Sequence, residues 1–141
     1  MANTVMTSFK SELLSGVHDL ATAGDTFKLS LYTSSSTIND AGTTIYETAN
    51  EVPDSGTYAA GGGTLANQAV SVDGTTAIVD FDDLSFTSAT ITSRYALIYN
   101  STEADKAVCV LDFGTDQTST SGTFTIQFPS AGASTAIIRV A

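Results

Sequence analysis

His18 is the only histidine of the chain, and it lies next to Asp19. A histidine paired with a carboxylate can act as the general base of a Ser-His-Asp triad. That triad also needs a serine placed by the fold and hydrogen-bond donors for an oxyanion. The sequence contains no Gly-x-Ser-x-Gly segment, the strained turn that presents such a serine in one large class of hydrolases. We therefore expect His18 to have a structural role, at the end of a helix or in an interface.

Three closely spaced carboxylates, Asp80, Asp82 and Asp83, are the second candidate for chemistry. Carboxylate pairs carry out glycoside hydrolysis, and carboxylate oxygens bind calcium. The surrounding sequence matches no calcium-binding loop, and aspartates at strand edges commonly serve solubility. We assign no metal ligand here, and the sequence leaves open whether these three carboxylates bind a cation.

Other reactive residue types have simpler explanations. Cys109 lies inside the apolar run AVCVL and is expected to be a buried, unreactive thiol. The glycine triplet at 61–63 lacks the lysine and the following helix of a phosphate-binding loop, so we expect a flexible turn. Asp112 is expected to pair with Arg94 or Arg139, in the interior or at a contact between subunits.

Five tyrosines could form a platform on which sugar rings stack, although the chain has no tryptophan. Tyrosine is also common in interfaces between proteins. The residues are Tyr32, Tyr46, Tyr58, Tyr95 and Tyr99. A sugar-binding role requires exposed rings, such as those of Tyr46 or Tyr58. From all these candidates together, the sequence predicts no catalytic residue, no bound cofactor and no metal site.

The charge of the chain restricts its partners. It carries 15 acidic and 5 basic residues in 141, a net charge of -10. The five cations form no cluster, so binding to nucleic acid through phosphates is not expected. The same charge opposes adsorption to anionic membranes. No apolar run approaches the roughly 18 residues of a membrane span, and the first residues lack the apolar core of a signal peptide. We expect synthesis in the cytoplasm without secretion.

The elements that position these residues begin with a helix in the N-terminal segment, 1–20. We expect Ser8 to cap this helix and Gly16 to end it. Its apolar residues at i, i+4, i+5 and i+8 share one face: Phe9, Leu13, Leu14 and Val17. A helix this short is marginal alone, so that face must pack on the sheet or on a neighbouring subunit.

A half-buried strand is expected next, because Phe27, Leu29 and Leu31 alternate with polar or amphipathic residues. Region 34–63 then carries few large apolar residues and many turn formers, which predicts long surface loops with short strands around 44–48 and 57–60. Loops of this length usually have a function or become ordered against a partner.

The segment NQAVSVDGTTAIVDF predicts a β-hairpin. Its Asp73-Gly74 pair separates two alternating runs, as in a two-residue turn. This register places Val72 opposite Thr75 and Val70 opposite Ala77. One face then turns toward the core with five apolar residues: Val70, Val72, Ala77, Val79 and Phe81.

Two strands that are apolar on both faces are expected at the centre of the molecule, at 94–100 and 106–113. After the polar stretch GTDQTSTSG, strands at 123–128 and 136–141 complete the chain. The pattern predicts a single domain over 1–141, mainly β, with roughly seven to nine strands and one short N-terminal helix. An antiparallel β-sandwich of jelly-roll-like type fits this pattern, with a closed barrel as the alternative.

Five blocks follow one another along the chain: TSFKSELLSGVHDL, DTFKLSLYTSSSTI, NEVPDSGTYAAGGGTL, ALIYNSTEADKAVCVLDFG and FTIQFPSAGASTAIIRVA. In this order they resemble a family of small virion proteins of tailed bacteriophages, over Thr7 to Ala141. The resemblance implies a non-enzymatic capsid decoration, or cement, protein. Such a protein is made in the host cytoplasm and binds the major capsid protein on the capsid exterior as a homo-oligomer, with a trimer expected. It carries over no site residue.

Three alternatives stay open. The chain could be another structural part of the virion, such as a head fibre, a collar or a tail-associated β-domain. It could be a carbohydrate-binding module that promotes adhesion to cells. A hydrolase would require a cleft that contains His18 or the carboxylates of Asp80, Asp82 and Asp83, with shifted pKa values.

Overall fold

The computed structural model describes residues 2–38 and 40–141. Within them the chain forms eight strands and one helix, and all strand pairs are antiparallel. The prediction of a mainly β, antiparallel, sandwich-like fold with one short helix is confirmed. The elements are β1 (Ala2–Val5), α1 (Thr7–Leu14), β2 (Phe27–Tyr32), β3 (Gly63–Thr64), β4 (Ala69–Asp73), β5 (Thr76–Asp80), β6 (Leu84–Asn100), β7 (Lys106–Ile126) and β8 (Ile138–Val140).

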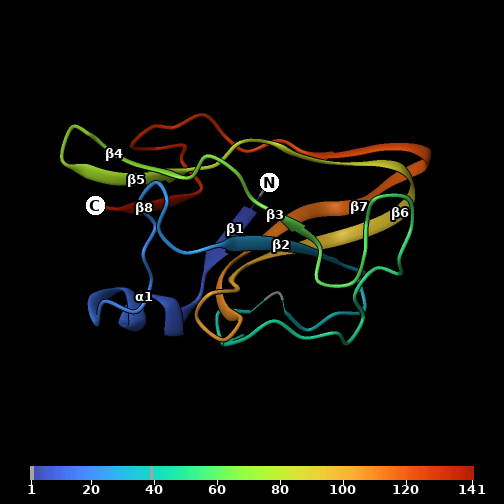
Figure 1. Cartoon of the computed structure of the whole chain (residues 1–141), viewed down its shortest axis with the longest axis horizontal. Helices are drawn as coiled ribbons and strands as arrows, with labels where there is room; N and C mark the ends of the chain where they lie inside the picture. The colour runs from blue at the N-terminus through green and yellow to red at the C-terminus, as the bar shows by residue number, and fades with distance from the viewer. Residues whose placement is uncertain (1, 39) are drawn as a thin grey trace.

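The strands form two sheets. The larger has the order β1-β7-β6-β2-β3, and the smaller has the order β4-β5-β8. In Figure 1 the small sheet lies at one end of the molecule beside the C-terminus, with α1 below it. β1 was not predicted, since the sequence showed only a helix in the first 20 residues.

β6 and β7 form a long, irregular hairpin, with 17 and 21 residues. The register between them shifts at several places, including the stretches Phe86/Ala89 and Ser93/Tyr95. Figure 1 shows both strands bending at the end of the molecule that lies away from α1. Bulges bend a ribbon in this way because the extra residue increases the local twist. Because of this bend, β6 and β7 run through both layers of the sandwich-like fold (Figure 1).

The core is built on the two central strands that the sequence predicted. Residues 95–100 of β6 and 107–111 of β7 are all buried. The strand predicted at 123–128 is the last part of β7, with Phe124 and Ile126 buried. The polar stretch between these parts, for which no strand was predicted, also belongs to β7 and pairs with β6.

Helix α1 ends as predicted and begins differently. The N–H of Val17 donates to the carbonyl of Glu12, and the N–H of Gly16 donates to that of Leu13. Gly16 has a φ of 74°, which completes the left-handed ending that favours glycine. The predicted cap is wrong, because the N-cap residue is Met6, with no side-chain cap. Ser8 lies inside the helix, and Val17 lies beyond it.

Region 34–63 is less peripheral than predicted. In place of the short strands expected at 44–48 and 57–60, it forms single bridges, such as Ile45 with Lys106 and Ser55 with Tyr58. Ile38, Val52 and Tyr58 are buried in the core. Few but well-placed apolar side chains hold this long segment against the central sheet.

The β4–β5 hairpin exists, with a different turn and a different environment. Asp73 pairs with Thr76, so the turn residues are Gly74 and Thr75. Gly74 has a φ of 63°, which suits the first position of a type II′ turn. Val70 and Val72 lie opposite Val79 and Ala77 on one face, but they are 51% and 70% exposed. The prediction that β4 faces the core is wrong, because β4 is an edge strand whose five residues are all exposed.

Candidate functional site

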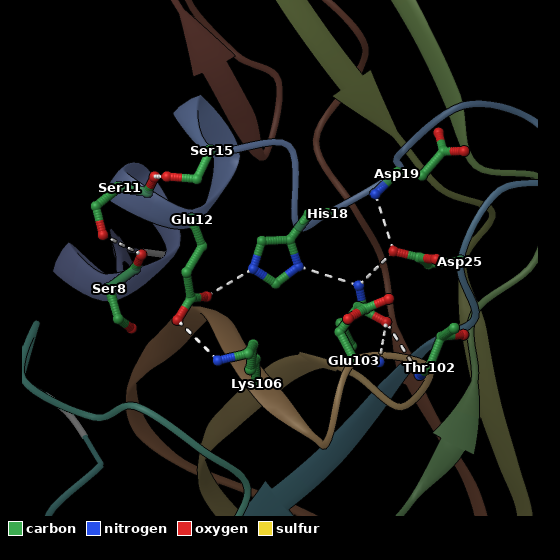
Figure 2. Close-up of polar contacts among 11 residues, drawn as sticks. Ser8, Ser11, Glu12, Ser15, His18, Asp19, Asp25, Thr102, Glu103 and Lys106 are labelled. Carbon is green, nitrogen blue, oxygen red and sulfur yellow. Dashed lines mark hydrogen bonds and ion pairs between the residues drawn. The ribbon is translucent and has the colours of Figure 1, made fainter.

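His18 lies at the centre of a buried polar network between α1 and the β6–β7 turn (Figure 2). Its Nε2 lies 2.8 Å from Oε2 of Glu12, and the other oxygen of Glu12 lies 3.3 Å from Nζ of Lys106. Its Nδ1 lies 3.0 Å from the amide nitrogen of Asn100. The imidazole therefore connects α1 to β6, and Glu12 connects α1 directly to β7.

Hydrogen bonding fixes the orientation of this network. Oδ1 of Asn100 accepts from the backbone N–H groups of Thr102 and Glu103, so Nδ2 must face His18 and Asp25. An amide nitrogen only donates. Nδ1 of His18 is therefore the acceptor, and its proton sits on Nε2, where it is donated to Glu12. Both ring nitrogens have partners when the imidazole is neutral.

The carboxylate of Asp19, the sequence neighbour, is not among the hydrogen-bond partners of His18 in the described part of the chain. Asp19 lies across the network, where its N–H donates to Asp25 and its carboxylate accepts from the N–H of Ala21 (Figure 2). The hydroxyls of Ser11 and Ser15 donate to carbonyls of α1 itself. Among the described residues, no serine hydroxyl is hydrogen-bonded to His18. This network holds α1 in place, and its geometry contains no serine aligned for attack.

A second buried network surrounds Glu51. Its carboxylate accepts from the hydroxyls of Tyr46 at 2.6 Å and Tyr58 at 2.8 Å, and from the N–H of Gly61 at 2.7 Å. Tyr99 donates to the carbonyl of Gly61 and stacks on Tyr46. Burial raises the pKa of Tyr46, Tyr58 and Tyr99 above the ordinary value for tyrosine.

This network gives the tyrosines a structural task. Tyr58 is 1% exposed, so it cannot stack on a sugar from solvent. Tyr32 is also buried and donates to the carbonyl of Glu47, and burial raises its pKa to about 12. Tyr95 lies apart, with the guanidinium of Arg94 over its ring. The exposed platform expected for sugar binding is therefore absent at Tyr58.

The three candidate carboxylates serve different parts of the chain. Asp82 accepts from the amide of Asn67, and Asp83 accepts from the N–H of Phe128. β5 ends at Asp80, so Asp82 and Asp83 lie beyond the strand. Within residues 2–38 and 40–141, no group of three or more His, Cys, Asp or Glu side chains is placed to hold a metal ion.

Asp112 and Cys109 match their structural interpretations, whereas the glycine triplet, expected to be a flexible turn, is packed against β2 and continues into β3. Asp112 pairs with Arg94 at 2.8 Å, and this hydrogen bond, with that from the N–H of Gly114, lowers the pKa of Asp112. Cys109 is fully buried, and burial raises its pKa to about 12. In the glycine triplet, a Cβ on Gly62 would meet the carbonyl oxygen of Leu29 at 1.7 Å, so the turn packs directly on β2.

The surface contains one feature that the sequence did not predict. Two adjoining apolar hollows, which share Leu13, Ile138 and Val140, lie between α1 and the small sheet. Among their lining residues, Leu14 is 90% exposed and Val140 is 52% exposed. We call the following side chains the apolar groove: Val5, Phe9, Leu13, Leu14, Val70, Ala77, Ile78, Val79, Ile138 and Val140. Lys10 and Arg139 line its α1–β8 end.

Comparisons with models of protein families, with curated proteins and with solved structures found no match. No helix in the described part of the chain is long and apolar enough to cross a membrane.

Proposed function

We propose that this chain is a non-enzymatic structural protein of a bacteriophage particle. It is a capsid decoration, or cement, protein that binds the major capsid protein on the outer surface of the head and stabilises the shell. It acts as a homo-oligomer, with a trimer as the expected assembly and a jelly-roll-like sandwich as its finer fold. The resemblance of five sequence blocks to small virion proteins of tailed bacteriophages supports this proposal.

The observation that carries the proposal is the contrast between the interior and one face of the surface. His18 and Glu51 have their polar atoms occupied by internal partners. By contrast, Leu14, within the apolar groove, and Val72, on the edge strand of the small sheet, are 90% and 70% exposed. Exposed apolar patches of this kind mark contact sites with other macromolecules. The molecule is thus better equipped for binding than for turnover.

The rest of the molecule suits a position on the outside of a shell. A net charge of -10 gives no affinity for packaged nucleic acid. The 34–63 region is already packed on the core, so binding need not order it. Many modest contacts repeated over a lattice gain strength through avidity.

Heat resistance of the particle tests the cement role. Particles stripped of the protein should rupture at a lower temperature, and adding back the purified chain should restore their resistance. A Leu14→Asp/Val72→Asp variant should restore it poorly. Thr120→Asp, at an exposed position of β7 outside the groove, should act as wild type. Stripped particles with unchanged heat resistance would contradict the proposal.

Electron microscopy of the particle separates this role from other structural roles. Locating and counting the chain should give on the order of hundreds of copies on the head for a cement protein, and about a dozen for a collar or tail component. A count near a dozen at the neck or tail would favour the alternative.

A further inference from the structure

Three Lys and Arg side chains form no ion pair within the described residues; two of them, Lys10 and Arg139, line the apolar groove, and the third, Lys28, lies outside it. Within residues 2–38 and 40–141, the ion pairs of Lys and Arg side chains use Arg94 and Lys106. Lys10 and Arg139 have no carboxylate partner there, although Arg139 donates weakly to a backbone carbonyl. No Asp or Glu side chain lines the α1–β8 end of the groove; Asp19 lines only the far end. The chain as a whole is acidic, with a net charge of -10, but the α1–β8 end of the groove is apolar and positively charged. It is therefore suited to bind an apolar side chain that is flanked by carboxylates.

The chain itself carries such a group. Ile45 is 54% exposed, and the other large apolar residues of comparable exposure belong to the groove or to the adjacent face of β4. A shallow hollow beside it is lined by Asp40 and Glu47. Neither carboxylate forms an ion pair within the described residues. The loop is thus apolar at its tip and negative at its sides, the complement of the groove.

This loop is held in shape before it meets any partner. The carbonyl of Thr44 accepts from the N–H of Ala107, and the N–H of Tyr46 donates to the carbonyl of Asp105. The side chain of Tyr46 is further bound to Glu51. Because the backbone on both sides of Ile45 is fixed to the β6–β7 turn, docking would cost little ordering entropy.

We propose that the apolar groove of one copy receives the Ile45 loop of a second copy. Ile45 packs against Leu13, Leu14 and Val140, while Asp40 and Glu47 face Lys10 and Arg139. The two surfaces differ, so the contact is heterologous, and repeated copies form a ring where the rotation closes. This inference names the contact within the homo-oligomer proposed above and rests on that part of the proposed function.

Charge reversal tests the contact on the full chain, with mass measured by sedimentation over a concentration series. Lys10→Glu/Arg139→Glu and Asp40→Lys/Glu47→Lys should each weaken association by roughly tenfold or more, because each places like charges on both surfaces. The variant with all four substitutions should restore association, because the charges of both surfaces are then reversed and opposite charges again face each other. Ile45→Ser should weaken association without changing any charge.

A matched control separates this effect from net charge. Lys10→Glu alone should weaken association, whereas Lys28→Glu, which makes the same change in charge at a cation that lies outside the groove, should leave association unchanged. All substituted side chains except Lys28 and Glu47 are largely exposed, and circular dichroism should confirm that each variant folds.

Two results would overturn the inference. One is association of the four-residue variant that is no stronger than that of either reversal alone. The other is a wild-type chain that stays monomeric at high concentration. If that monomer still binds stripped particles and restores their heat resistance, the cement role stands and only the contact between copies is wrong. If the chain assembles as described but leaves heat resistance unchanged, the contact stands and the cement role is wrong.

Discussion

Replacing Tyr58 by phenylalanine tests whether the Glu51 network holds the long 34–63 region on the core. The hydroxyl of Tyr58 donates to Glu51 at 2.8 Å and accepts from the N–H of Leu31 at 2.8 Å. Phenylalanine keeps the ring, which packs edge-on against Phe86, and removes only the oxygen. Leu31 is then left with an unpaired, buried N–H, and Glu51 loses one of its three donors.

The expected cost follows from these two losses. A hydrogen bond to a charged group contributes about 1.5–3 kcal/mol, and an unpaired buried donor costs about 1–3 kcal/mol. Since the losses share one oxygen and are not additive, we expect Tyr58→Phe to lower the free energy of unfolding by about 2–4 kcal/mol. For a chain of this size, that lowers the melting temperature by roughly 6–15 °C.

Urea unfolding and a thermal melt provide the measurement, with Tyr46→Phe as the control. Tyr46 is half-buried and has one hydrogen bond to Glu51, so its loss should cost about 1 kcal/mol. The reasoning is refuted if the two variants are equally stable, or if Tyr58→Phe changes stability by less than about 0.5 kcal/mol.

Three further predictions use the same unfolding assay. Burial raises the pKa of Tyr32 from its ordinary value of 10.0 to about 12, so above pH 10.0 its hydroxyl stays protonated in the folded chain and ionises in the unfolded chain. The contribution of Tyr32 to the free energy of unfolding should be fully present below pH 10.0 and should be lost as the pH rises to about 12. A stability profile that stays flat over this range would contradict the prediction. His18→Phe leaves Glu12 and Asn100 each short of a partner and should cost about 2–3 kcal/mol; a neutral effect would show that the network does not hold α1. Leu14→Ser, at a 90% exposed site, should change stability by less than about 0.5 kcal/mol, whereas Leu97→Ala, in the buried core, should cost about 2–5 kcal/mol.

The central strands could be predicted because their apolar residues on both faces are compatible with only one position, between two covering layers. Leu97 and Ile98 are adjacent and point to opposite faces, and both are fully buried. The same holds for Val108 and Cys109 in the partner strand. A strand with apolar residues on both sides must be covered on both sides, wherever the rest of the chain lies.

The polar part of β7 could not be predicted in the same way. The stretch GTDQTSTSG has the composition of a loop, yet residues such as Gln117 and Thr118 pair with β6. Residues 114–118 are all exposed, so their polar side chains face solvent on both sides of the strand while the backbone forms the ladder with β6. Composition alone does not distinguish such a strand from a turn, because whether the segment forms a strand depends on pairing with another strand that is distant in the sequence.

The two polar networks escape sequence analysis for a related reason. Asn100 is 82 positions from His18 in the sequence, and no local spacing of residues predicts their contact. Asp19 was the nearer carboxylate in sequence, but the chain turns away after His18, and Glu12 on the preceding helix takes its place. Glu51 likewise collects donors from both sides of a loop whose path depends on a few buried residues.

The exposed valines of β4 bear directly on function. An edge strand with Val70 and Val72 facing solvent is prone to pair with other chains, and such edges are usually blunted by charge. Here the nearest carboxylate on the strand, Asp73, is held by the N–H of Ala133 at the turn and does not cover the apolar face. An exposed apolar face on an edge strand is best explained if another chain covers it in the assembly in which the protein functions. This reasoning favours a role in assembly, because a protein that acts alone gains nothing from leaving that face open.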